Sequence, residues 1–229
     1  KGHNWSEWLH FSNIDGEVRW CLVCKKEEKR PLSTGEDGSG DSLHDENENP
    51  EPSTKKPPKP GTKFTAEDGN VYTVVTAGFV VEFTKAGNTK ASSVSIPSKV
   101  TFDGADYQVA AIKANAFQGS QTLKQVKIPD SVKTIGNHAF KNCTSLTSVV
   151  IPKKVTKIGK QAFYNCKKLK NITIKTTKLT AKKVGNKAFT KAGSSNYKKL
   201  KVKVPAKKLS AYKKLLKKKG LSSKAKVKK

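Results

Sequence analysis

The amino-acid sequence predicts a repeat solenoid with a parallel β-sheet on one face. Three observations predict it: apolar residues recur at intervals of 23, each repeat ends in alternating apolar and polar residues, and strand-rich and helical segments flank the repeats. One unit of this length cannot bury its own apolar face, so several units must stack around a common core. We therefore expect a β-rich cap at the N-terminal end and a helical cap at the C-terminal end.

The repeat consists of columns that hold identical or similar residues. Its pattern is I-G-x-x-A-F-x-x-C-x-x-L-x-x-V-x-I-P. A looser copy covers 184–205, and a partial earlier copy covers 94–97. The columns that keep the 23-residue spacing are Ile112, Ile135 and Ile158; Phe117, Phe140 and Phe163; and Leu123, Leu146 and Leu169.

Each part of the unit has a physical reading. The segment L-x-x-V-x-I alternates apolar and polar residues, which predicts a short strand with one buried face. The Pro that follows has no N–H to donate, so the strand ends there. The segment G-x-x-A-F predicts a compact turn or a short helical segment that buries its Phe.

The two caps follow from different patterns. Upstream, residues 71–75, 79–84 and 92–96 predict strands that are joined by turns. Downstream, 205–220 predicts a helix that has an apolar stripe and an opposite face composed almost wholly of Lys. We expect the stripe to dock on the open end of the solenoid; the alternative is binding to a membrane surface. The stripe consists of Leu209, Tyr212, Leu215 and Leu216.

Composition divides the 229 residues into three parts. Residues 1–31 form a small module with all three Trp and a Cys pair, and 32–61 form a linker that is acidic and then rich in Pro and Lys. Low hydrophobicity predicts that this linker is disordered. Residues 62–229 form the repeat domain with its caps. No apolar run approaches the ~18 residues that span a bilayer, and because the chain begins at Lys1 we expect a signal peptide or upstream domain to precede it.

The net charge of +28 is concentrated in the repeat domain. Residues 61–229 hold 37 Lys and 6 acidic residues, and no acidic residue follows Asp130. Such a charge attracts polyanions. Lys is a flexible point charge, whereas base-specific reading relies on the planar fork of Arg. The composition therefore favours contact with an acidic partner over specific binding of nucleic acid, the alternative being a surface that is merely solvated.

The repeats also resemble a known family. The segments 135–143 and 158–166, each followed by L-x-x-V/I-x-I, resemble BspA-like leucine-rich repeats, which are common in surface and secreted proteins of bacteria. The resemblance covers about residues 94–205 and departs from the family pattern at Lys175, which replaces the Pro. It implies a curved leucine-rich-repeat solenoid, an extracellular or cell-surface location, and an adhesive or binding role.

The outward positions of the predicted strands form the candidate binding surface. Their side chains are basic at both ends of the sheet and polar in the middle, with almost no aromatic residue. The alternative is a sheet face that is only solvated. The candidate ligand-binding residues are Lys124, Lys127, Ser148, Val150, Lys170, Thr173, Lys201 and Lys203.

The four cysteines fall into two pairs. Cys143 and Cys166 share a repeat column with Ser120 and Ala192, so the column selects small volume and predicts buried free thiols in place of a disulfide. The other pair is a C-x-x-C motif in the small module, where zinc, a local disulfide and an unstapled segment all remain open. We expect no cofactor in the repeat domain. The candidate zinc ligands are Cys21, Cys24, His3 and His10.

The repeat domain shows no catalytic motif. It has no Ser/His/Asp grouping and no phosphate-binding Gly loop, and its six acidic residues form no patterned pair. We therefore expect a non-enzymatic, exported bacterial adhesion module that contacts an acidic glycan, a teichoic acid or other envelope polymer, or a host surface protein. The alternatives are a structural spacer and a targeting fragment of a larger surface protein or enzyme.

Overall fold

The computed structural model describes residues 58–76 and 78–229, and the backbone of 9–10, 17–20 and 27–30. The chain divides into two compact units, Lys1–Lys56 and Pro57–Lys229. In the first unit, β1 (Leu9–His10), β2 (Glu17–Trp20) and β3 (Glu27–Arg30) form an antiparallel sheet. The three-part division predicted from composition stays a prediction, since the predicted linker lies largely outside the described residues.

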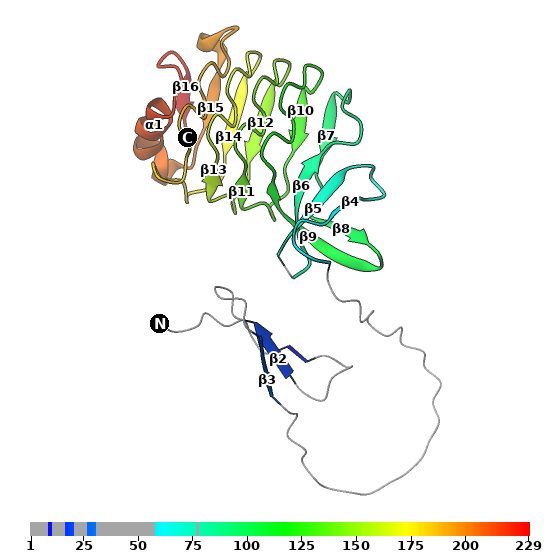
Figure 1. Ribbon diagram of the computed structural model, residues 1–229. Helices are drawn as coiled ribbons and strands as arrows, with labels where there is room; N and C mark the ends of the chain where they lie inside the picture. The colour runs from blue at the N-terminus through cyan, green and yellow to red at the C-terminus, as the bar shows by residue number, and fades with distance from the viewer. Residues whose placement is uncertain (1–8, 11–16, 21–26, 31–57, 77) are drawn as a thin grey trace, which may run out of the picture. The chain divides into compact units, whose positions relative to one another are not determined.

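The second unit is a solenoid, which confirms the predicted fold class. Its long side is a parallel six-stranded sheet in which Val126 pairs with Val149 and Val149 with Ile172 (Figure 1). In these two pairs the register advances by one 23-residue repeat, so each of these repeats contributes one strand to this sheet. In sheet order the strands are β16 (Lys226–Lys228), β15 (Lys201–Lys203), β14 (Asn171–Ile174), β12 (Ser148–Ile151), β10 (Gln125–Lys127) and β7 (Ser93–Ser95).

A second sheet runs along another side of the coil and continues into the N-terminal cap. Its short repeat strands precede glycines that pack against the preceding coil: a Cβ at Gly136 would lie 2.5 Å from the backbone nitrogen of Ala114. This explains the I-G column, whose strands the sequence analysis did not predict. In sheet order the strands are β13 (Lys157–Ile158), β11 (Thr134–Ile135), β9 (Ala105–Ile112), β6 (Val80–Lys85), β5 (Val71–Thr76) and β4 (Lys63–Thr65), with β8 (Lys99–Phe102) paired to β9.

The G-x-x-A-F segments form turns with no helix, and these turns have left-handed backbone at fixed positions. One such column holds Gly119, Asn142, Asn165 and Lys191, with φ values of 79°, 61°, 60° and 59°. Gly and Asn adopt this conformation more readily than other residues. The turn geometry therefore accounts for the Asn that recurs before the Cys of the repeat.

A continuous stack of phenylalanine rings forms the centre of the core. The stack runs from the cap into the last repeat, with centroids 5.0 to 5.5 Å apart and interplanar angles of 4° to 12°. The cap thus supplies the first ring of a column that the repeats continue, which removes the apolar end of the first coil from water. The rings are Phe83, Phe117, Phe140, Phe163 and Phe189.

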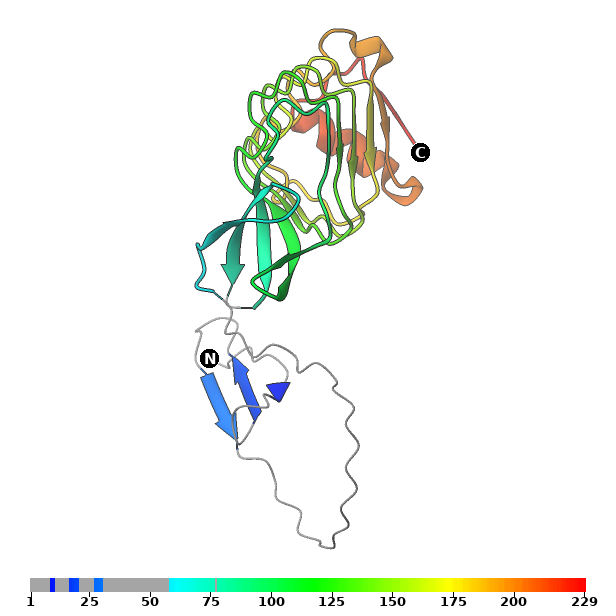
Figure 2. The same ribbon diagram turned by 90° about the vertical axis from the view of Figure 1, so that its right-hand side faces the viewer.

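The C-terminal cap is a helix that closes the end of the coils opposite the N-terminal cap (Figure 2). After η1 (Tyr197–Lys199) and η2 (Ala206–Lys208), α1 spans Leu209–Lys218 and buries Tyr212 and two leucines of the predicted stripe. The stripe therefore docks on the solenoid as predicted. The helix is shorter than the predicted 205–220, because its first residues form the separate turn η2. No helix among the described residues is long and apolar enough to cross a membrane.

Candidate functional site on the exposed face of the six-stranded sheet

The register of the six-stranded sheet places alternate residues in two rows on the outer side of the sheet. The residues between the rows, such as Val126, Val149 and Val202, are buried in the core, so the strands hold the rows in fixed positions. Adjacent strands lie about 4.8 Å apart. One row contains Ser93, Gln125, Ser148, Asn171, Lys201 and Lys226, and the other contains Ser95, Lys127, Val150, Thr173, Lys203 and Lys228.

Six of the eight predicted binding residues lie in these rows. Lys124 and Lys170 instead lie one residue before β10 and β14, where both side chains are exposed at the entry to the strands. Ser148 and Thr173 are half-buried, whereas Val150 is 39% exposed, which is unusual for a large apolar residue in this domain. The structure thus brings six of the eight residues to one face and the other two to its edge, and their role in binding stays a prediction.

The C-terminal end of this face carries four lysines that we call the lysine tetrad: Lys201, Lys203, Lys226 and Lys228. Lys201 pairs with Lys226, and Lys203 pairs with Lys228, on adjacent parallel strands. All four side chains are exposed. Like charges directly opposite each other on neighbouring strands destabilise a sheet, so the tetrad is an electrostatic cost that folding alone does not require.

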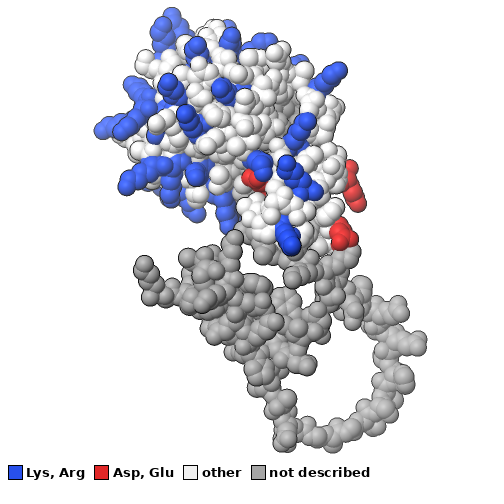
Figure 3. Space-filling model, viewed as in Figure 1, with Lys and Arg blue, Asp and Glu red and all other residues white. Residues whose placement is uncertain are grey.

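The strands that carry the tetrad and the repeats next to them contain no carboxylate side chain, because no acidic residue follows Asp130. Between the described residues, the ion pairs are Lys99 with Asp106 and Lys113 with Glu82, both in the N-terminal part of the domain. On the face seen in Figure 3, lysines spread over the repeats while the acidic side chains lie over the N-terminal cap. Within 58–76 and 78–229, the positive end of the sheet face is therefore not offset by an ion pair.

Sequence reasoning missed the outermost strand of this face. Lys226 and Lys228 belong to β16, which follows the predicted helix and extends the sheet by one strand. A signal was present: Lys226-Val227-Lys228 repeats the Lys-Val-Lys pattern of 201–203. Without the 23-residue spacing, that short pattern could not be assigned to the sheet.

The cysteines of the repeats are free and buried, as predicted. The Cys143 Sγ donates a hydrogen bond to the Phe117 carbonyl at 2.9 Å, and the Cys166 Sγ donates to the Phe140 carbonyl at 3.0 Å. Burial raises the pKa of the Cys143 thiol to about 12 and also raises that of Cys166. Both thiols are therefore neutral at physiological pH, when they are neither nucleophiles nor metal ligands.

The candidate zinc site is not tested by these observations. Cys21, Cys24 and His3 lie outside the described residues, and only the backbone of His10 is described. Within the described part of the chain, no three His, Cys, Asp or Glu side chains cluster as metal ligands would. Zinc in the small module stays a prediction, and a zinc content near zero in the reduced protein would contradict it.

Comparison with known proteins identifies the repeats. The model of the BspA type leucine-rich repeat region matches residues 87–213 in six copies. The chain belongs to the BspA-type leucine-rich repeat family. The resemblance inferred from the sequence is thereby confirmed, over a longer stretch than the repeat columns indicated.

Solved structures with the same fold come from bacteria. A leucine-rich cell surface protein of Faecalibacterium prausnitzii A2-165 is 28% identical with a TM-score of 0.51, and the match covers 63% of this chain and 37% of that one. A leucine-rich repeat protein of Bacteroides capillosus ATCC 29799 is 25% identical with a TM-score of 0.53, and the match covers 63% of this chain and 99% of that one. No curated protein sequence matches significantly. The chain thus spans just over a third of one relative and nearly all of the other.

Proposed function

We propose that this chain is a non-enzymatic adhesion module of a bacterial cell surface, and that the lysine end of its six-stranded sheet binds an acidic polymer. The observation that carries the proposal is the lysine tetrad, whose in-register cations form no ion pair with a carboxylate among the described residues. An anionic group between Lys201 and Lys226, or between Lys203 and Lys228, relieves a repulsion that the free protein retains.

The spacing of the tetrad suits a polymer with regularly placed anionic groups. Charges in one row are about 4.8 Å apart across strands, and the two rows are about 6.6 Å apart along each strand. Lys offers a flexible point charge, so this surface selects charge density over the exact outline of an anion. The scarcity of exposed aromatic rings on the face argues against a site that recognises sugars by stacking. A teichoic acid or a sulfated or sialylated glycan fits these features.

A relative supports the location, and the side chains of the repeats support the absence of catalysis. One relative is described as a cell surface protein, which supports a surface location for this chain. The repeats supply buried thiols with raised pKa values and isolated carboxylates in place of catalytic groupings. A targeting role within a longer protein is the second candidate, because the chain spans 37% of the cell surface relative.

Calorimetric titration of the full chain tests the proposal. The probes are purified teichoic acid, heparin, mucin and fibronectin, each titrated over a series of salt concentrations. We expect saturable binding to one acidic polymer that persists at about 0.15 M salt, where the Debye length is about 8 Å. Equal binding to every polyanion that vanishes as salt rises would show that net charge alone is responsible. The module would then be a basic spacer.

A further inference from the structure

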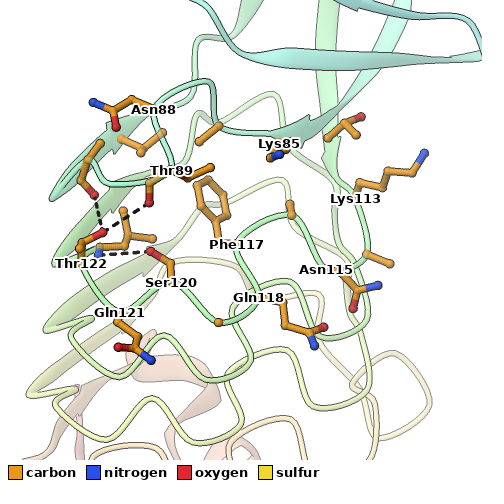
Figure 4. A pocket seen from close by; sticks show the side chains of 18 residues that line it. Lys85, Asn88, Thr89, Lys113, Asn115, Phe117, Gln118, Ser120, Gln121 and Thr122 are labelled. Carbon is orange, nitrogen blue, oxygen red and sulfur yellow. Dashed lines mark hydrogen bonds between the residues drawn. The ribbon is translucent and has the colours of Figure 1, made fainter.

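A pocket of about 610 Å³ lies at the N-terminal end of the solenoid, away from the lysine tetrad. The loop after β6 forms one wall, and the turn of the first complete repeat forms the other (Figure 4). Phe117 contributes to its lining, and amides and hydroxyls, including those of Asn88, Asn115, Gln118 and Gln121, surround it. Most of its side chains are uncharged, so the pocket differs chemically from the sheet face.

Inside the solenoid, successive turns are joined by three backbone hydrogen bonds, which we call the turn ladder. The N–H groups of Asn115, Phe117 and Gly119 donate to carbonyls in the next turn at 3.0, 2.8 and 2.8 Å. The following turn repeats the pattern from residues 138, 140 and 142 at 2.9, 2.8 and 2.9 Å, and the next turn repeats it again. Each turn therefore presents donors at alternate residues on one side and carbonyl acceptors at alternate residues on the other.

The turn ladder ends unpaired at the pocket. By repeat position, the acceptors of the first turn are the carbonyls of Ala114, Ala116 and Gln118, which correspond to Asn137, Ala139 and Lys141. No donor among the described residues reaches these three carbonyls. All three residues line the pocket.

The two caps treat the turn ladder differently. The N-terminal cap pairs with the first coil at its short strand, where the Lys113 N–H donates to the Phe83 carbonyl at 2.8 Å, and it does not extend over the following turn. At the opposite end, the Phe189 N–H is paired with the Lys219 carbonyl at 3.0 Å, so the centre of the last turn is capped. The solenoid thus lacks one rung at its N-terminal end.

We propose that the pocket binds a peptide segment that supplies this missing rung. A peptide backbone presents N–H donors at alternate residues with the spacing that the interior turns already use, so one short segment satisfies all three carbonyls. The ring position above Phe117 is filled by Phe83, with centroids 5.0 Å apart. The central residue of the bound segment must therefore be small, such as Gly, Ala or Ser. The site continues the interface between repeats and does not depend on the acidic ligand proposed for the sheet.

A peptide derived from the chain itself is the first probe. It is a capped copy of residues 135–144 with Phe140→Ala, which clears the ring, and Cys143→Ser, which prevents oxidation. The copy carries one lysine and no acidic residue, so the basic protein does not attract it unspecifically. In NMR titration of the full chain, we expect saturable shifts of the carbonyl ¹³C signals of Ala114, Ala116 and Gln118.

Two controls separate the turn ladder from other contacts. N-methylation of the peptide at positions 138, 140 and 142 removes the three donors and should weaken binding at least about tenfold. In the protein, Ala114→Trp should block the pocket, because Asn137 and Lys160 show that this column accepts a larger exposed side chain. The matched variant Ala211→Trp, at an exposed position on α1, should bind the peptide unchanged.

Three outcomes would overturn the inference. The first is equal binding of the N-methylated peptide, the second is equal binding by Ala114→Trp, and the third is no saturable shift up to about 1 mM peptide. A neutral oligosaccharide such as maltotetraose that shifts the same carbonyls, while the peptide does not, would assign the pocket to a glycan. Lys203→Glu should leave the peptide affinity unchanged, so the proposal for this pocket and the proposal for the sheet face can be contradicted separately.

Discussion

Certain single residues in the turns have a left-handed backbone conformation, which only some residue types adopt easily. Gly119, Asn142 and Asn165 occupy one left-handed column with residues suited to it, whereas Lys191 occupies the same column with φ 59°. A non-glycine residue with this backbone costs about 1–2 kcal/mol relative to the right-handed region. The last repeat, which the sequence already shows to be irregular, therefore contains a strained position.

Replacing Lys191 by glycine should relieve this strain. We expect Lys191→Gly to raise the free energy of unfolding by about 0.5 kcal/mol, because the relief exceeds the entropy that glycine loses on folding. Denaturant unfolding of the full chain measures it. Lys182→Gly is the control, since Lys182 is also exposed but has no positive φ, and it should lower stability. A destabilised Lys191→Gly variant would show that the column carries no strain.

The buried thiols make the stability of the fold decrease as the pH rises in the alkaline range. Because burial raises the pKa of Cys143 to about 12 from an ordinary 9.0, the folded protein keeps a proton that the unfolded chain releases. Stability is therefore complete below about pH 9 and falls as the pH rises, by about 1 kcal/mol for Cys143 at pH 10. Cys143→Ala combined with Cys166→Ala should flatten this dependence. If the double variant kept the slope of the parent between about pH 8.5 and pH 9.5, below the ordinary tyrosine pKa of about 10, the thiols would not be its cause.

Among the elements, the capping helix depends on one hydrogen-bonded tyrosine. The Tyr212 hydroxyl donates to the Thr176 carbonyl at 3.0 Å and accepts from the Leu179 N–H at 3.1 Å. Both partners belong to the loop between β14 and the last repeat, and the ring is buried. The hydroxyl thus connects the helix to the coil that it covers.

Removing that hydroxyl should weaken the cap. Tyr212→Phe leaves two buried backbone groups unpaired and should lower the free energy of unfolding by about 1–3 kcal/mol. The control is Lys213→Ala on the exposed side of α1, where a change within about 0.5 kcal/mol is expected. Denaturant unfolding, followed by the circular dichroism of the backbone, measures both variants. Equal stability of Tyr212→Phe and the parent would show that the helix docks through its leucines alone.

The sheet strands β15 and β16 carry an electrostatic penalty that a single charge reversal should remove. Lys226→Glu places a carboxylate opposite Lys201 and should raise the free energy of unfolding by about 0.2–1 kcal/mol at low salt. The gain should shrink as salt screens the pair. Lys213→Glu reverses a charge on α1 and corrects for the relief of overall net charge. If both variants gain equally, the cross-strand repulsion is negligible.

For the whole molecule, local patterns predicted the repeats and the kind of cap at each end, but not how far each cap extends over the repeats. The columns of Phe and Leu fixed the parallel strands, because a 23-residue repeat brings equivalent side chains together on adjacent coils. The sheet-face residues from Lys127 to Lys203 followed from simple alternation. Strand β16 could not be predicted in this way, since its register depends on the path of the chain around α1. The pocket beside Phe117 could not be predicted either, because it results from a cap that stops short of the turn.

The central claim is that position on the sheet, beyond net charge, determines binding. The most direct test compares two double variants with the same change in charge, Lys203→Glu with Lys228→Glu on the sheet and Lys213→Glu with Lys214→Glu on α1. Calorimetry with the acidic polymer that binds best, at about 0.15 M salt, should show at least about a tenfold loss of affinity for the sheet variant and less than about threefold for the helix variant. Equal losses in the two variants would contradict the claim and leave the sheet without a binding site.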